Sequence, residues 1–271
     1  MGAGNGGGMS LEHKFRQEAA VAGLRREEHA ARVITETDVA PLPVTARRYL
    51  RFMRVVGRGQ DWSFRLAMRG RFRTKPRGRW MNCETWQYNS RIDVARIFHI
   101  RVRFAGLASV IARDTYLNGT GHMRIRLMDR ITVGEGRGAE FDIGELVTYL
   151  NDAVMICPTM LFVPAVSWSE VDDSSFDLAF TDHGLRISAR VLVDAGGAPI
   201  DFTTTDRFCY DPANPKALLR AGWRSPIAGW QIEGDRPIPV GGRAIWELPD
   251  GPFDYAEFKP VRESLAFNVG P

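Results

Sequence analysis

Three side chains that can exchange protons fall within one predicted β-hairpin. Asp114 and Tyr116 are two positions apart and would share a face of a strand, and the turn at Asn118–Gly119 brings His122 close to them. A carboxylate, a phenol and an imidazole could form an acid/base relay, in which Asp114 orients His122 and Tyr116 donates a proton. Ordinary hairpin contacts are the alternative interpretation.

Two further carboxylates belong to a predicted helix over residues 142–155. The segment begins with Asp142 in the N-cap position, and Glu145 follows three residues later. Asp152 lies one heptad after Glu145 and on nearly the same side, so the pair could point at a sheet. A carboxyl group buried in an aromatic cavity has a raised pKa and can act as a general acid. The alternatives are helix capping for Glu145 and a solvent-facing position for Asp152.

Tryptophans are the candidates for contact with a ligand. We select Trp86, Trp168 and Trp246, together with Asp172 from the acid-rich stretch 168–177. That stretch resembles, weakly, the aspartate-rich magnesium motif of helical terpene synthases, but its serines predict a turn and no second motif follows. Asp172 is therefore expected to form a turn, with a ligand contact as the alternative. The charged residues of the pairs Asp206–Arg207 and Trp246–Glu247 could also lie inside the fold.

Motifs for metal, nucleotide or nucleophilic chemistry are not found. The sequence contains no GxSxG, HExxH or P-loop motif, and the stretch GEGRG at 134–138 is too short for a dinucleotide fingerprint. Its five histidines are dispersed, and its three cysteines are scattered and odd in number. The sequence therefore predicts neither a metal site nor a cofactor.

These residues depend on a series of predicted strands with a period of two. Apolar and polar side chains alternate in WSFRLAMRGRFR, RIFHIRVRF, HMRIRL and GLRISARVLVD, which begin at residues 62, 96, 122 and 184. Turn residues separate the runs, as at Asn118–Gly119 and His183–Gly184. Ten or so strands joined by short loops indicate a large antiparallel meander.

Helices are predicted at the N-terminus and once within the meander. Residues 1–9 are Gly-rich and are expected to be a disordered leader; Ser10 caps a helix in the segment 10–40, and a better packed helix follows Pro43. Residues 41–271 are predicted to form one β-rich domain. The expected fold is mainly β (α+β): a large curved antiparallel sheet or open barrel, with two N-terminal helices and one inserted helix across an aromatic-lined cup.

Charge is distributed unevenly along the 271 residues. Residues 1–130 carry 25 Lys and Arg against 11 Asp and Glu, whereas residues 131–271 carry 11 against 21. Only four of the cationic residues are lysines, and the arginines fall on the polar faces of strands. We expect a wet convex side and two complementary halves, with no nucleic-acid partner. No apolar run is long enough for a membrane span, and a cytoplasmic protein is expected.

Six segments together carry a resemblance to a known family: WQYNSR at 86–91, ARDTYLNGTGHMRIRL at 112–127, GAEFDIGELVTYLND at 138–152, WSEVDD at 168–173, DRF at 206–208 and PIPVGGRAIWELPDGPFDY at 237–255. Over roughly residues 41–265 the chain resembles a bacterial family of unknown function. The resemblance implies a single domain, shaped like the half-barrel of lipoprotein carriers that shelter acyl chains. The lipoprotein signal of such carriers is not found, so an envelope role is not expected.

Two functions follow as hypotheses. The first is a cofactor-independent acid/base isomerase or cyclase, which acts on a terpenoid, polyketide or lipid-like molecule in the cup. The second is a noncatalytic binder or carrier of a similar hydrophobic ligand, since an apolar cavity suits both. A buried carboxylate with a perturbed pKa would favour the enzyme. The sequence leaves the oligomeric state open.

Overall fold

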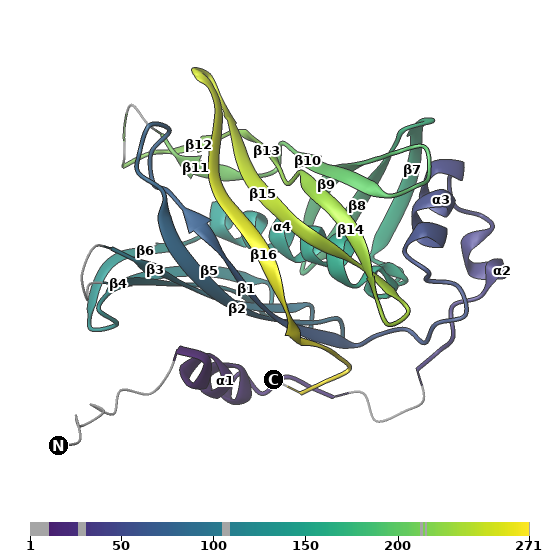
Figure 1. The fold of residues 1–271 in the computed structure, drawn as a ribbon, viewed down its shortest axis with the longest axis horizontal. Helices are drawn as coiled ribbons and strands as arrows, with labels where there is room; N and C mark the ends of the chain where they lie inside the picture. The colour runs from purple at the N-terminus through teal and green to yellow at the C-terminus, as the bar shows by residue number, and fades with distance from the viewer. Residues whose placement is uncertain (1–10, 27–30, 105–108, 212–213, 215, 271) are drawn as a thin grey trace.

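The computed structural model describes residues 11–26, 31–104, 109–211, 214 and 216–270. The predicted leader over 1–9 and the predicted cap Ser10 lie outside the described residues. Within them the protein is mainly β, and the predicted fold class is confirmed: one large, curved antiparallel sheet that does not close into a barrel (Figure 1).

The sheet contains 14 strands, and a separate two-stranded ribbon completes the β structure of the described residues. In spatial order the strands run β6-β5-β4-β3-β2-β1-β16-β15-β13-β10-β9-β8-β7, with β14 paired to β15; β11 and β12 form the ribbon. The strand bounds are β1 Ser63–Phe72, β2 Met81–Ser90, β3 Ala95–Arg103, β4 Ser109–Leu117, β5 Thr120–Leu127, β6 Ile131–Arg137, β7 Val166–Asp172, β8 Ser175–Asp182, β9 Leu185–Val193, β10 Pro199–Thr204, β11 Phe208–Tyr210, β12 Leu218–Arg220, β13 Gly222–Arg224, β14 Ile227–Glu233, β15 Arg236–Leu248 and β16 Gly251–Phe267.

Two meanders make up the two wings of the sheet. The first runs outward from β1 to β6. The second returns from β7 at the opposite edge to β15 and β16, and β16 pairs with β1 at the centre. The turn at Asn118–Gly119 has φ values of 52° and 77°, as a two-residue hairpin of type I′ requires. The predicted meander is therefore confirmed, with more strands than expected.

Helix α4 (Ala139–Ile156) connects the two edges and lies in the hollow between the wings (Figure 1). It begins after Gly138, not at Asp142, which instead accepts a hydrogen bond from the Gly121 amide at 2.6 Å. Gly136 lies against the Phe141 ring, where a Cβ would come within 2.1 Å of a ring carbon. Gly136 of the GEGRG stretch thus allows close packing under the helix.

The N-terminal helices are shorter than predicted. Helix α1 (Leu11–Val21) lies against the outer side of β2 and β3, and the short α2 (Glu36–Val39) precedes α3 (Val44–Phe52), which packs on β7 and β8. A 3₁₀ turn, η1 (Pro158–Leu161), follows α4. No helix among the described residues is long and apolar enough to cross a membrane.

The main core fills only one side of the hollow. It joins α3, one face of α4 and the wing from β7 to β10, with Tyr49 packed on Phe176 and Tyr149 stacked on Phe180. Tyr49 also donates a hydrogen bond to the carbonyl oxygen of Val154 at 2.8 Å. The other side of the hollow, above β1 to β5, contains a cavity.

The convex side of the sheet is not uniformly exposed to solvent, contrary to expectation. Helix α1 covers part of it, where Phe15 is fully buried against Tyr88 and Ile97. His99 is buried there as well, and its Nε2 lies 2.5 Å from Glu18 on α1. Among the outward arginines, Arg71 contacts Glu257 of the other half at 2.6 Å, whereas Arg101 and Arg103 contact Glu84 of their own half.

Candidate functional site

A cavity of about 900 Å³ lies between the concave side of the sheet and α4. Its walls are mostly apolar and come from the inward faces of β1 to β5, β15 and β16, as the alternation in the sequence predicts. The apolar wall includes Leu66, Met68, Phe72, Met81, Phe98, Ile100, Val102, Val110, Ala112, Met123, Ile125 and Phe258.

Strand register separates an aliphatic end of the wall on β2, β3 and β4 from a polar end. Arg73, Thr74 and Lys75, which follow the Met81 partner Phe72, also line the cavity at the aliphatic end. On β3 the lining residues run from Arg96 through Phe98 and Ile100 to Val102. On β4, Asp114 pairs with Phe98 and Val110 pairs with Val102, and on β2 Gln87 also pairs with Phe98. Charged and amide groups therefore gather at one end of these strands, and aliphatic side chains at the other.

Helix α4 turns its polar face toward the cavity. The lining residues form a helical stripe: Phe141, Gly144, Glu145, Thr148, Asn151, Asp152 and Met155. The opposite face, with Leu146, Val147, Leu150 and Val154, is fully buried in the main core. The polar stripe is therefore enclosed within the protein, and it supplies much of the polar end of the cavity.

Arg96 connects the two helical carboxylates. Its Nη1 donates to Glu145 Oε2 at 2.9 Å, and its Nε donates to Asp152 Oδ2 at 2.7 Å. The Arg96 and Glu145 side chains are 5% and 8% exposed, so the ion pairs are desolvated. Burial raises the pKa of both Glu145 and Asp152 despite the adjacent guanidinium. The predicted proximity of Glu145 and Asp152 is confirmed.

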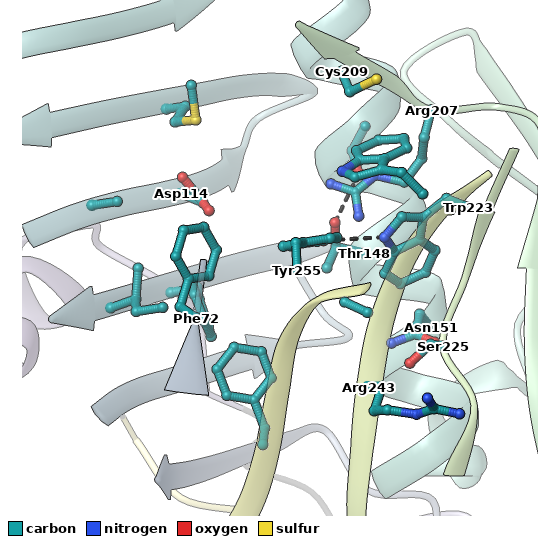
Figure 2. Close-up of a pocket in the computed structure, with 18 of the residues that line it drawn as sticks. Phe72, Asp114, Thr148, Asn151, Arg207, Cys209, Trp223, Ser225, Arg243 and Tyr255 are labelled. Carbon is teal, nitrogen blue, oxygen red and sulfur yellow. Dashed lines mark hydrogen bonds between the residues drawn. The ribbon is translucent and has the colours of Figure 1, made fainter. Parts of the chain in front are cut away.

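Asp114 is the third carboxylate of this end, and it makes no hydrogen bond or ion pair with another described residue. Its Oδ1 is buried without a partner, and the accessible part of the side chain opens into the cavity (Figure 2). Burial, together with the charge of Glu145, raises the pKa of Asp114 to about 7. At neutral pH this group is therefore partly protonated.

Arg207 lies on the other side of the cavity from Asp114 in the view of Figure 2. Its guanidinium carbon is 4.6 Å from the Trp223 ring centroid and 5.3 Å from that of Trp246. Trp223 Nε1 donates to the Tyr255 hydroxyl at 3.1 Å, which fixes this aromatic wall. Arg207 Nε is buried without a hydrogen-bond partner, and we find no ion pair of Arg207 within the described chain. Two indole faces hold the cation, and its charge acts on Asp114 and Glu145.

The predicted relay of Asp114, Tyr116 and His122 is not assembled. In the β4–β5 register His122 is opposite Thr115, one position out of phase with Asp114, so it faces the other side of the sheet and lies 2.8 Å from Glu135. Tyr116 does share the inner face, but its hydroxyl donates to Asp182 at 2.7 Å. The turn places His122 next to Asp114 and Tyr116 along the hairpin. Because side chains alternate between the two faces of the sheet, the His122 side chain lies on the outer face.

Of the four predicted ligand contacts, only Trp246 lines the cavity. Trp86 lies on the convex side beneath α1, and Trp168 stacks on Phe176 in the main core, with ring centroids 5.6 Å apart. Asp172 forms the β7–β8 turn, where it accepts a hydrogen bond from the Ser174 amide at 2.8 Å. The turn interpretation of Asp172 is therefore confirmed.

Two of the charged groups of the site carried a signal in the sequence. Arg96 begins the run RIFHIRVRF in phase with its apolar residues, so it had to face inward with Phe98. The sequence allows either Asp206 or Arg207 to lie inside the fold. Arg207 lines the cavity, whereas Asp206 accepts hydrogen bonds from Ser188 and Arg220 outside the cavity. No cluster of three metal-binding side chains occurs in the part of the chain that is described.

The fold and site define a class: β-rich proteins with an open antiparallel sheet that encloses an apolar cavity under a buried helix. The chain belongs to the family of unknown function DUF6544, whose model matches residues 32–258. No curated protein matches the sequence.

Solved structures with similar folds include three bacterial proteins. One is a domain from Vibrio parahaemolyticus assigned provisionally to outer membrane lipoprotein sorting, with a TM-score of 0.41, 10% identity and coverage of 86% of this chain and 94% of that one. Another is a DUF1329 family protein from Desulfovibrio piger, with a TM-score of 0.41, 12% identity and coverage of 89% of this chain and 95% of that one. A third is a LolA superfamily protein from Nitrosomonas europaea, with a TM-score of 0.34, 9% identity and coverage of 84% of this chain and 92% of that one.

Proposed function

We propose that this protein is a noncatalytic binder or carrier of a hydrophobic small molecule, which it holds between the concave sheet and α4. The observation that carries the proposal is the 900 Å³ cavity with its predominantly apolar wall. A ligand that covers this wall removes apolar surface from water, at about 25 cal/mol per Å². A cavity of this size is in the usual range for small-molecule sites.

The register of the lining residues supports an elongated ligand with one polar end. The Met81, Val102 and Val110 end would receive an apolar chain, and the Arg96 and Asp114 end would receive a polar group. Buried polar groups need partners, and the polar end contains several that lack one.

An acid/base isomerase or cyclase acting on a similar ligand is the second candidate. The buried, partly protonated Asp114 favours it, because a carboxyl group that titrates near neutrality suits general acid/base catalysis. Without a partner for Asp114 in a relay, the binder accounts for more of the observations. The cytoplasmic location expected from the sequence stays a prediction.

Gly144 offers a direct test, because a Cβ built there meets no atom within 4 Å and points into the open side of α4. We expect Gly144→Phe to fill part of the cavity and to weaken binding of the neutral apolar probe diphenylhexatriene by about tenfold or more. Gly144→Ala is the matched control and should bind the probe like the wild type.

Probe fluorescence titrated with each variant gives the affinities, and circular dichroism checks that all three proteins are folded. Equal affinity of wild type and Gly144→Phe would contradict the proposal, as would an absence of saturable binding by the wild type. Conversion of a bound lipid-like molecule by the wild type, lost in Asp114→Asn, would establish the enzyme instead.

A further inference from the structure

Building on the proposed function, we infer that the ligand is a long-chain monocarboxylic acid, whose carboxylate is held by Arg207 at the polar end and whose binding takes up a proton. Three observations carry this inference: a half-buried cation whose buried Nε has no partner, a cavity carboxyl group without a hydrogen-bond or ion-pair partner, and an aliphatic wall that suits an alkyl chain.

The first observation concerns Arg207. Its guanidinium is fixed by the faces of Trp223 and Trp246, and these contacts leave the N–H groups at its edge free to donate. Nε is buried without a partner. A carboxylate is the group that matches a guanidinium edge best, since it can accept two parallel hydrogen bonds. An alcohol would leave the charge of Arg207 uncompensated.

The aromatic wall also argues against a ligand with a cationic head. Trp223 and Trp246 would be the natural faces for an ammonium group, but Arg207 already occupies them. A second cation would lie against the first and be repelled by it. The polar end thus selects an anionic or neutral head, and Arg207 favours the anionic one.

The second observation concerns Asp114, whose carboxyl group has no hydrogen-bond or ion-pair partner among the described residues. The cavity lining also includes the cations Arg73, Lys75, Arg96 and Arg243 and the acids Glu140, Glu145, Asp152 and Asp211. Arg96 is occupied by Glu145 and Asp152, which leaves Asp114 opposite Arg207. A ligand carboxylate would compete with the charged form of Asp114 for Arg207. Protonated Asp114 removes this competition, and its Oδ1, now without a partner, could share the proton with the ligand.

The sign of the pH dependence follows from the groups that face Asp114. Glu145 on α4 opposes its charge, Arg96 on β3 and Arg207 favour it, and the Tyr255 hydroxyl on β16 is nearby and neutral. Asp152 on the same helix is paired with Arg96. Their balance, dominated by burial, places the pKa of Asp114 at about 7 in the empty protein. Affinity for an anion is therefore highest below pH 7, and falls by up to about tenfold per pH unit above it.

The third observation is the apolar end, lined on β2, β3 and β4 by aliphatic side chains. An alkyl chain laid along these strands buries its methylenes one by one. Each added methylene should strengthen binding about fourfold until the cavity is filled, which corresponds to about 0.8 kcal/mol.

The test compares dodecanoate, dodecanol and dodecylamine as competitors of diphenylhexatriene, each at about pH 6 and about pH 9. The carboxyl group of dodecanoate is ionised at both pH values, since the pKa of a carboxylic acid in water is about 4 to 5. We expect dodecanoate to bind at least about tenfold more tightly than dodecanol at the lower pH, and to lose most of that advantage at the higher pH.

Variants assign the effect to residues. Arg207→Met should reduce the affinity for dodecanoate to that for dodecanol, and Asp114→Asn should remove most of the pH dependence. Arg220→Met is the charge-matched control, because Arg220 lies outside the cavity with a 60% exposed side chain. Tighter binding of dodecanol or dodecylamine, or a preference for dodecanoate that survives Arg207→Met, would overturn the inference. Failure of all three compounds and of the probe would instead reject the proposed function.

Discussion

At the scale of residues, the Asp114 carboxyl group lowers the stability of the folded protein while lining the proposed binding site. An aspartate with a pKa of about 7 retains in the native state a proton that the unfolded chain has lost between about pH 4 and pH 7. Stability therefore falls as the pH rises through that window, and the full cost is present above pH 7. An asparagine would not carry this cost, which suggests that the carboxyl group is needed for function.

We predict that Asp114→Asn raises the free energy of unfolding at about pH 8, by up to about 4 kcal/mol, and has little effect at about pH 4. Urea denaturation at both values measures the difference. Asp173→Asn, at an exposed turn, is the control and should change little at either pH. A stabilisation of equal size at both pH values would show that the Asp114 carboxylate is not the cause.

Much of the candidate site could be predicted at this scale, but not the way its members combine. Asp114, Glu145, Asp152 and Trp246 were recognisable from type and spacing, and all four line the cavity. His122 was misplaced because nearness along a hairpin does not fix which side of the pleat a side chain takes. Phase relative to the apolar positions decides this, and it would also have selected Arg96.

At the scale of elements, α1 and α4 differ from what their sequences suggest. The polar stripe of α4 is enclosed, although a polar stripe ordinarily faces water. Sequence predicts the helix and its two faces, but the destination of each face depends on the topology of both wings. Helix α1 has a narrow apolar stripe, which is typical of a loosely docked helix, yet Phe15 and Ala19 are fully buried.

We expect Phe15→Ala to detach α1 from β2 and β3, since the loss of a buried phenylalanine side chain costs about 3–5 kcal/mol. Detachment at this local level should speed trypsin cleavage at Arg16 and Arg25 by at least about tenfold. Val21→Ala, at a residue that is 84% exposed on the same helix, should leave the rate unchanged. If Phe15→Ala is cleaved no faster, α1 is held by other contacts.

At the scale of the whole molecule, the cavity results from the topology. The period-two runs predicted a curved antiparallel sheet, and the register confirms which faces lie inward. The pairing of β1 with β16 could not be predicted, because it joins segments about 190 residues apart whose patterns fit many partners. This pairing places β15 and β16 beside β1 in the wall of the hollow, and a cavity remains between the sheet and α4.

The most direct measurement of the central claim is native mass spectrometry of the protein purified without detergent, alongside Gly144→Phe. The account predicts that the wild type carries, or takes up in a one-to-one complex, a lipid-like molecule that the filled variant lacks. Fragmentation of the complex would identify the molecule, and Gly144→Ala controls for the change of backbone. A wild type that stays free of any adduct after incubation with apolar molecules, or a filled variant that carries the same adduct, would contradict the account.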